Sequence, residues 1–229
     1  MKKTTLVVFL LLTSSNLFAS TISPQINSIE SEWADIYYTE NNSQQKAHYP
    51  ALIQKARILS EKNPEAIEPV IWWAILIATN AAFETPLKAL SSIETAKNLL
   101  EHCIKTDPEA LKGAALVVLG TLYYMTPGWP ISFGDQEKAN ILFQRALEIN
   151  PLSVDSNYFY ADYLLSKDDI KNAQIYFKRA IAVPSRPNQQ FADTQLKEEA
   201  RTALINAQNR KLQNGKNKFL SLFSSAEAQ

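Results

Sequence analysis

The stretch Ala139–Pro151, which reads ANILFQRALEINP, decides the fold. Ala139, Phe143 and Ala146 recur at intervals of four and three residues, so they lie on one face of a helix. The following Asn150-Pro151 ends that helix, because proline cannot continue it and suits the first turn of the next one. Two short side chains beside an aromatic ring allow a second helix to approach closely. The stretch therefore predicts a helix that packs tightly against a neighbour.

The same order of residue types recurs along the chain. Residues 173–180 repeat it before Val183-Pro184, and residues 96–103 repeat it with Leu100 and Cys103 before Asp107-Pro108. A further break stands at Asn63-Pro64, so the prolines are spaced by roughly 33 to 44 residues. A period in this range is typical of proteins built from repeated helical units.

These helices resemble the second helix of the tetratricopeptide repeat (TPR), in which small, aromatic and alanine positions precede a proline. Leu119-Gly120 with Tyr123 matches the pattern of the first helix, and Tyr160-Ala161 with Leu164 matches it loosely. The resemblance covers most of residues 47–184. It implies antiparallel helical hairpins that stack into a solenoid with a concave surface.

Apolar periodicity and the proline positions together predict an all-α protein. Over residues 20–213 we expect a TPR-like solenoid of about four hairpins, closed by a C-terminal capping helix with one charged face. Residues 214–229 are predicted to be a tail. Its apolar side chains either dock on the last helix or contact a partner or a membrane. The expected helices are 25–40, 46–62, 67–82, 87–106, 109–126, 135–149, 153–166, 169–182 and 190–213.

The first 19 residues have the features of a secretory signal peptide. Lys2 and Lys3 precede the apolar run Leu6–Leu12, and Ala19 offers a cleavage site. The run is too short to span a bilayer. We expect a periplasmic or secreted protein cut after Ala19; an uncleaved anchor is the alternative.

Composition argues against several classes of function. The 23 basic and 23 acidic residues give zero net charge, whereas nucleic-acid binders carry a basic excess. A single cysteine, Cys103, excludes an internal disulfide and fits a core position. His48 and His102 are the only histidines, and no nucleotide-binding, hydrolase or zinc-protease motif occurs. We therefore expect no enzyme, cofactor or metal site. The acidic residues near residue 30, Glu30, Glu32 and Asp35, are interpreted as helix-surface groups.

Residues 127–134 lengthen one repeat beyond the standard unit. Two prolines and two glycines stop the flanking helices, and Asp135 is placed to cap the next one. Trp129 and Phe133 are large apolar side chains in what should be a solvent-facing loop. They either fold back into a groove or contact a partner or ligand.

Two helices carry more apolar surface than one core face needs. The run Val70–Ala78 is apolar all round, so neighbouring helices wrap it, or one face lines an apolar cavity or an oligomer interface. On helix 153–166 the aromatic residues 158, 159, 160 and 163 cover more than one face, which predicts that some rings lie off the core. Asp162 sits among them and faces water, a tyrosine hydroxyl or a partner.

A narrower resemblance involves residues 120–135, GTLYYMTPGWPISFGD, with the helix that follows. This run looks like the T-component TPR proteins that accompany TRAP-type transporters. The resemblance implies a periplasmic scaffold that docks a solute-binding protein, with a groove for an apolar ligand and a homo-oligomeric assembly. The lipid-anchoring cysteine of that family is missing, because Ala19-Ser20 stand in its place.

The sequence thus favours an exported TPR scaffold for protein–protein interaction. The alternatives are a carrier of a small apolar ligand in a groove near Trp72 and Trp73, and a cell-envelope assembly adaptor. The expected partner is a protein and not a nucleic acid, with membrane contact at most through the tail. The residues predicted to bind a partner or ligand are Tyr123, Trp129, Phe133, Asp135, Tyr158 and Asp162.

Overall fold

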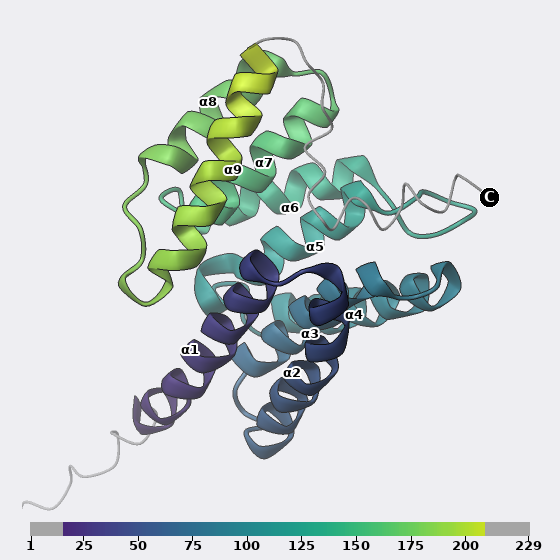
Figure 1. Ribbon diagram of the computed structural model, residues 1–229, viewed down its shortest axis with the longest axis vertical. Helices are drawn as coiled ribbons and strands as arrows, with labels where there is room; N and C mark the ends of the chain where they lie inside the picture. Colours follow the sequence, from purple (N-terminus) through teal and green to yellow (C-terminus); the bar gives the residue numbers. More distant parts are fainter. Residues whose placement is uncertain (1–15, 209–229) are drawn as a thin grey trace, which may run out of the picture.

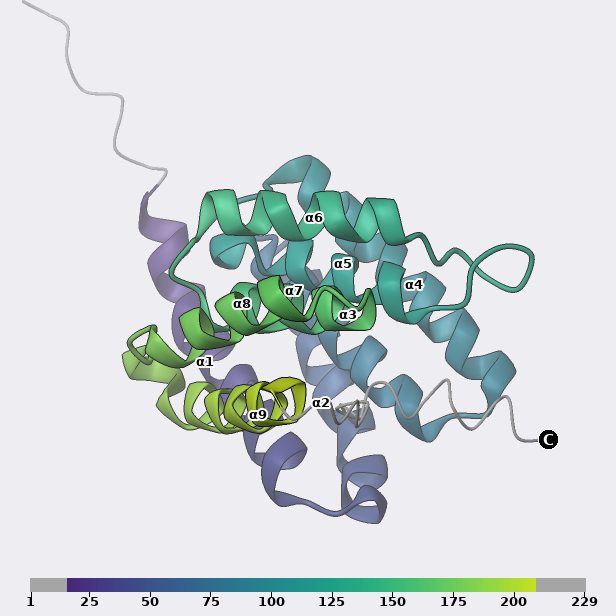
Figure 2. The same cartoon turned by 90° about the horizontal axis from the view of Figure 1, so that it is seen from above.

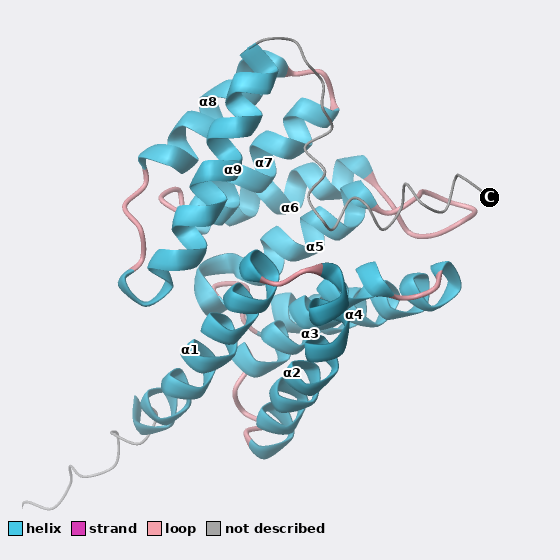
Figure 3. Ribbon diagram, viewed as in Figure 1, coloured by secondary structure: helices cyan, strands magenta, loops and turns pink. Residues whose placement is uncertain are grey.

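In the computed structural model the backbone of residues 16–208 and the side chains of residues 22–207 are described. This part of the chain forms nine α-helices and no strand, which confirms the predicted all-α class (Figure 3). Short 3-10 turns lie at 81–83, 110–113 and 187–189. The helices are α1 Asn16–Thr39, α2 Asn42–Lys62, α3 Glu68–Asn80, α4 Pro86–Thr106, α5 Ala114–Met125, α6 Gln136–Ile149, α7 Val154–Ser166, α8 Ile170–Ala182 and α9 Gln190–Gln208.

Consecutive helices pair into four hairpins, as the repeat pattern predicts (Figure 1). The pairs are α1 with α2, α3 with α4, α5 with α6, and α7 with α8, and α9 packs on the last pair. Because one hairpin cannot bury its apolar face alone, each pair stacks on the next and the core runs through the solenoid.

The small positions of the repeat permit close helix packing. A Cβ atom added to Gly120 on α5 would lie 3.2 Å from the ring of Phe143 on α6. Phe143, Phe177 and Cys103 are all fully buried, so the aromatic and small positions of the pattern form the core as predicted. The pattern therefore indicates the face on which the second helix of a hairpin packs against the first.

Several helix boundaries differ from the predicted ones. Helix α1 begins at Asn16, not at residue 25, and continues through Pro24. Proline removes one backbone hydrogen bond, but packing of α1 against its neighbours maintains the helix on both sides. The helix predicted over 109–126 begins only at Ala114, because Leu111 and Lys112 have left-handed φ angles of 47° and 56°.

The first and last helices meet. Helix α1 packs against α9 and the turn before it, and the rings of Tyr38 and Phe191 lie edge to face, 6.0 Å apart. Seen from above, α1 and α9 lie next to each other on one side of the molecule (Figure 2). The charged face of α9 is therefore only partly a solvent-facing cap: Lys197 is buried and donates to Ser185 Oγ at 2.8 Å.

The predicted terminal segments lie mostly outside the described residues. This applies to residues 1–15 of the signal peptide, to 209–213 of the last predicted helix and to the tail 214–229. Helix α1 includes residues 16–19, so the described backbone is helical on both sides of the predicted cleavage site after Ala19. Among the helices that the structure describes, none has the length and apolarity needed to cross a membrane.

Candidate functional site

The inner side of the solenoid contains a partly open cavity of about 360 Å³. Every odd-numbered helix contributes to its wall and no even-numbered helix does. One residue from each of α1, α3, α5, α7 and α9 illustrates this, namely Trp33, Trp72, Val118, Phe159 and Leu196. The volume lies in the range of small-molecule sites. Because α1 and α9 are in contact, this partly open cavity lies between the first and last helices of the described chain.

Aromatic side chains from α1 and α3 form one wall. The ring of Trp33 lies 5.7 Å from that of Trp72 and stacks on Tyr37 at 5.3 Å. Trp72, Ile75, Ala78 and Thr79 present one face of α3 to the cavity, so this apolar helix is neither wrapped completely nor fully core. Trp73 packs on the cluster that α1, α2 and α3 form instead.

An ion-pair cluster stands at the junction of α7 and α9. The Arg186 Nη2 atom lies 2.9 Å from an oxygen of Asp155, and the guanidinium also pairs with Asp193. The backbone N–H of Arg186 donates to Asp193 at 2.7 Å. The cluster thus ties the turn before α9 to α9 through Asp193, which has 0% exposure, and to α7 through the partly exposed Asp155.

Glu30 on α1 faces the cavity and is only 8% exposed. It forms no hydrogen bond or ion pair with the described residues. Burial raises its pKa from 4.5 to about 7; Arg186 opposes this shift, and Asp155 and Asp193 add to it. Its interpretation as a surface group was wrong, because the side chain faces the inner cavity, near Arg186, Asp155 and Asp193.

One sequence signal could have located Glu30. With Trp33 and Tyr37 it follows the spacing i, i+3 and i+7, which places the carboxyl on the same helix face as two aromatic rings. What the sequence does not contain is the cavity that α1 forms together with helices distant in sequence. Two further polar atoms are buried in the wall without a partner among the described residues: Trp33 Nε1 and the Oγ of Ser156, whose side chain is 1% exposed.

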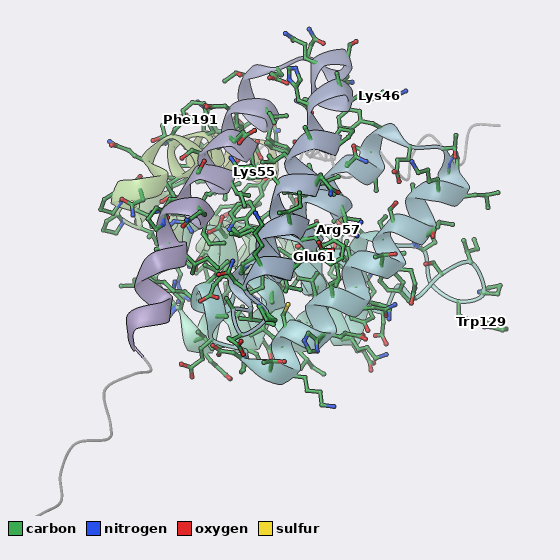
Figure 4. All side chains as sticks on the ribbon, turned by 90° about the horizontal axis from the view of Figure 1, so that it is seen from below. Lys46, Lys55, Arg57, Glu61, Trp129 and Phe191 are labelled. Atoms are coloured by element: carbon green, nitrogen blue, oxygen red, sulfur yellow. The ribbon has the colours of Figure 1, made fainter. Side chains whose placement is uncertain are left out.

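The long loop forms a second, separate surface on the outside of the solenoid. The ring of Phe133 packs edge to face on Tyr123 at 5.4 Å, and the ammonium of Lys97 on α4 lies 5.5 Å from its centre. The Tyr123 hydroxyl bonds to Glu101 at 3.0 Å. Trp129 is 90% exposed and projects away from the helices (Figure 4). We call Tyr123, Trp129, Phe133 and Asp135 with their neighbours the loop surface.

Of the two loop aromatics, Phe133 therefore folds back onto the helices, whereas Trp129 remains exposed. Asp135 caps α6 as predicted, accepting the N–H groups of Glu137 and Lys138 at 3.1 and 3.0 Å. The backbone N–H of Lys138 is the main cause that lowers the pKa of Asp135. The carboxylate is thus engaged in fixing the loop to its helix.

Gly134 fixes the path of this loop. A Cβ atom added there would lie 1.9 Å from the backbone oxygen of Thr126, whereas one added at Gly128 would meet its nearest atom at 3.4 Å. We expect Gly134→Ala to displace the loop and to lower the free energy of unfolding by about 2 kcal/mol, as overpacking does. Gly128→Ala is the matched control and should be nearly neutral in urea unfolding. Equal effects of the two changes would contradict this packing.

The other two predicted site residues lie on α7, away from the loop surface. Tyr158 donates from its hydroxyl to Glu199 at 3.1 Å, and Tyr124 donates to Asp162. Burial raises the pKa of Asp162 from 3.8 to about 6. Asp162 thus bonds a tyrosine hydroxyl, the second of the options that the sequence left open to it.

The aromatic residues of α7 were predicted to include some rings off the core, and one of the four, Phe159, lies off it. Tyr158, Tyr160 and Tyr163 are all buried. Helix α7 packs against α5, α6, α8 and α9, so more than one of its faces is covered. Phe159 is half-buried and faces the inner cavity.

Few groups suited to catalysis come together in the described part of the chain. His48 bonds to Glu40 at 2.9 Å on the surface, His102 is exposed on α4, and Cys103 is buried. Between residues 22 and 207, no group of three or more histidine, cysteine or acidic side chains is arranged to hold a metal ion.

Comparison with known proteins identifies one repeat. A search of curated proteins finds no match to the chain. The family model of the tetratricopeptide repeat matches residues 154–185, which are α7, α8 and the turn that follows. Such repeats generally serve as protein–protein interaction modules in non-catalytic scaffolds. The chain therefore contains a tetratricopeptide repeat, formed by α7 and α8, within an all-α solenoid of helical hairpins.

Proposed function

We propose that this protein is a scaffold that docks a protein partner on its loop surface. The observation that carries the proposal is the exposure of Trp129 on a loop whose base is fixed by packing and hydrogen bonds. Tryptophan is enriched among the residues that dominate binding energy at protein interfaces. A rigid base reduces the conformational entropy that a partner would otherwise have to remove.

The inner face of the solenoid indirectly supports docking of the partner on the loop surface. In an open solenoid the concave side is available to a partner, but here α1 and α9 meet and leave a cavity of about 360 Å³. That volume suits a small molecule rather than a folded protein. A protein partner is therefore expected on the outside.

The finer parts of the proposal come from the sequence. Residues 1–19 support export to the periplasm, and the likeness of residues 120–135 to the T-component proteins supports a solute-binding protein as the partner. The residues that define the loop surface lie within residues 120–135. In the competing hypothesis this protein is a cell-envelope assembly adaptor, and the identity of the captured partner distinguishes the two.

A crosslinking capture experiment tests the loop surface. The tagged full-length protein is crosslinked in its own cells, and captured proteins are quantified by mass spectrometry. We expect Trp129→Ala to reduce capture of the main partner at least about tenfold, which corresponds to about 1.4 kcal/mol. The control is Ile205→Ala, since Ile205 is also exposed and lies on α9.

The outcomes separate the hypotheses. A solute-binding protein lost in the Trp129 variant supports the transport scaffold, and envelope-assembly proteins lost in the same way support the adaptor. Equal capture by wild type, Trp129→Ala and Ile205→Ala would contradict docking through the loop surface.

A second candidate function is a carrier of a small molecule, and the inner cavity favours it. The wall contains Trp72 on α3, as the groove predicted near that residue requires. Native mass spectrometry of protein purified without detergent tests this candidate. A bound mass that is released on unfolding is the expected result, and the bare polypeptide mass in every preparation would contradict it.

A further inference from the structure

The carboxyl group of Glu30 has no role in holding the fold together. Glu30 borders the cavity, is only 8% exposed as a residue, and forms no hydrogen bond or ion pair with the described residues. Burying an unpaired carboxyl group costs free energy, so such groups are normally paired or hydrogen-bonded. An unpaired one that borders a cavity points to a partner inside that cavity.

The charged residues around the cavity indicate which charge the bound ligand should carry. Glu30, Asp155 and Glu199 line it, and Asp193 stands behind Arg186. The two cations in the wall are Arg186, which already pairs with two carboxylates, and Lys112, which is exposed on the turn before α5. Carboxylates therefore outnumber cations, and a positively charged ligand group is complementary.

The aromatic residues near Glu30 on α1 also suit a positively charged ligand group. Trp33 stands one turn further along the same helix face, and its ring stacks on Tyr37. Indole and phenol rings attract cations through their electron-rich faces, most strongly where water is excluded. Apolar side chains elsewhere in the wall, among them Trp72, Val118 and Leu196, can cover a hydrocarbon body.

We propose that the inner cavity binds an amphipathic amine, with its ammonium group against Glu30 and Trp33 and its apolar body along α3, α5 and α9. This inference rests on the carrier function and specifies its ligand class.

Three probes with the same hydrocarbon chain test the ligand class. Decylammonium, decanol and decanoate are titrated into the full-length protein by isothermal titration calorimetry at pH 8. We expect decylammonium to bind at least about tenfold more tightly than decanol, and decanoate to bind most weakly. This difference corresponds to one well-placed charge interaction.

The Glu30→Gln variant tests whether the Glu30 carboxylate causes the preference for decylammonium. The variant keeps the size of the side chain and removes its charge, so decylammonium should lose about tenfold in affinity while decanol is unaffected. The matched control is Glu32→Gln, because Glu32 lies on the same helix but is exposed and pairs with Lys55 at 2.6 Å. Glu32→Gln should leave all three affinities unchanged.

The affinity should also depend on pH in one direction. Alkylammonium groups stay protonated up to about pH 10. Glu30 must lose its proton to pair with one, and its pKa in the free protein is about 7. We therefore expect decylammonium to bind about tenfold more weakly at pH 6 than at pH 8. Arg186, Asp155, Asp193, Glu199 and Lys112 are the other charged groups around the cavity, and Glu30→Gln should abolish this dependence.

The outcomes distinguish the ligand class from the carrier function. Equal binding of the three probes, with no effect of Glu30→Gln, would overturn the amine but retain an apolar carrier. Preference for decanoate would also overturn it. If no probe binds and native mass spectrometry finds no retained mass, the carrier function fails together with the inference.

Discussion

Replacing Glu30 by glutamine is expected to stabilise the protein at pH 8 by up to about 3 kcal/mol. A carboxyl group whose pKa rises from 4.5 to about 7 on folding disfavours the folded state wherever it is ionised. Each pKa unit corresponds to about 1.4 kcal/mol, and the full effect appears only above pH 7. At pH 5 the group is protonated in the folded state, so the gain should fall below about 1 kcal/mol. Urea unfolding at the two pH values measures both numbers.

The control for this prediction is again Glu32→Gln. Glu32 is exposed, and exposed ion pairs contribute little to stability. We expect it to change the free energy of unfolding by less than about 0.5 kcal/mol at either pH. A destabilised Glu30→Gln at pH 8 would mean that the carboxylate holds the fold together, which would remove the reason for assigning it to a ligand.

The second large effect is expected at Arg186. Arg186→Met should lower the free energy of unfolding by about 3 kcal/mol, because it leaves the fully buried Asp193 without its ion-pair partner. The guanidinium is partly exposed, so the estimate lies at the low end of the range for buried pairs. Urea unfolding at pH 8 provides the measurement.

A double-mutant cycle separates the ion pair from the packing of the arginine stem. Asp193→Asn removes the buried charge and keeps the acceptor for the backbone N–H of Arg186. If the pair is the cause, the double variant loses clearly less stability than the two single variants together. Strict additivity would assign the effect to packing of the side chain.

The sequence predicted the features that repeat. Ala139, Phe143 and Ala146 form a local pattern whose meaning depends only on the helix and its immediate neighbour, so the hairpins and their core faces follow from it. Asp135 as a helix cap follows in the same way. The folded-back position of Phe133 and the exposed one of Trp129 were left open, because both rings belong to an insertion without a repeat partner.

The inner site could not be predicted because it depends on contacts between distant parts of the chain. Glu30 is polar and lies in a helix with other carboxylates, so on sequence alone it belongs on the surface. It is buried because α1 forms the cavity together with helices that are distant in sequence, α7 and α9 among them. The left-handed residues Leu111 and Lys112, which border the same cavity, gave no sequence signal because neither is a glycine.

The most direct test of the inner site is the pKa of Glu30 itself, with and without an amine. It is followed by NMR of the full-length protein carrying ¹³C-labelled glutamate carboxyl groups, and its signal is identified by its loss in Glu30→Gln. We predict a pKa of about 7 in the free protein and a fall of at least about one unit when decylammonium saturates the cavity. A pKa near 4.5 in the free protein, or one that decylammonium leaves unchanged, would contradict the claim that Glu30 is a buried carboxylate that binds a cationic ligand.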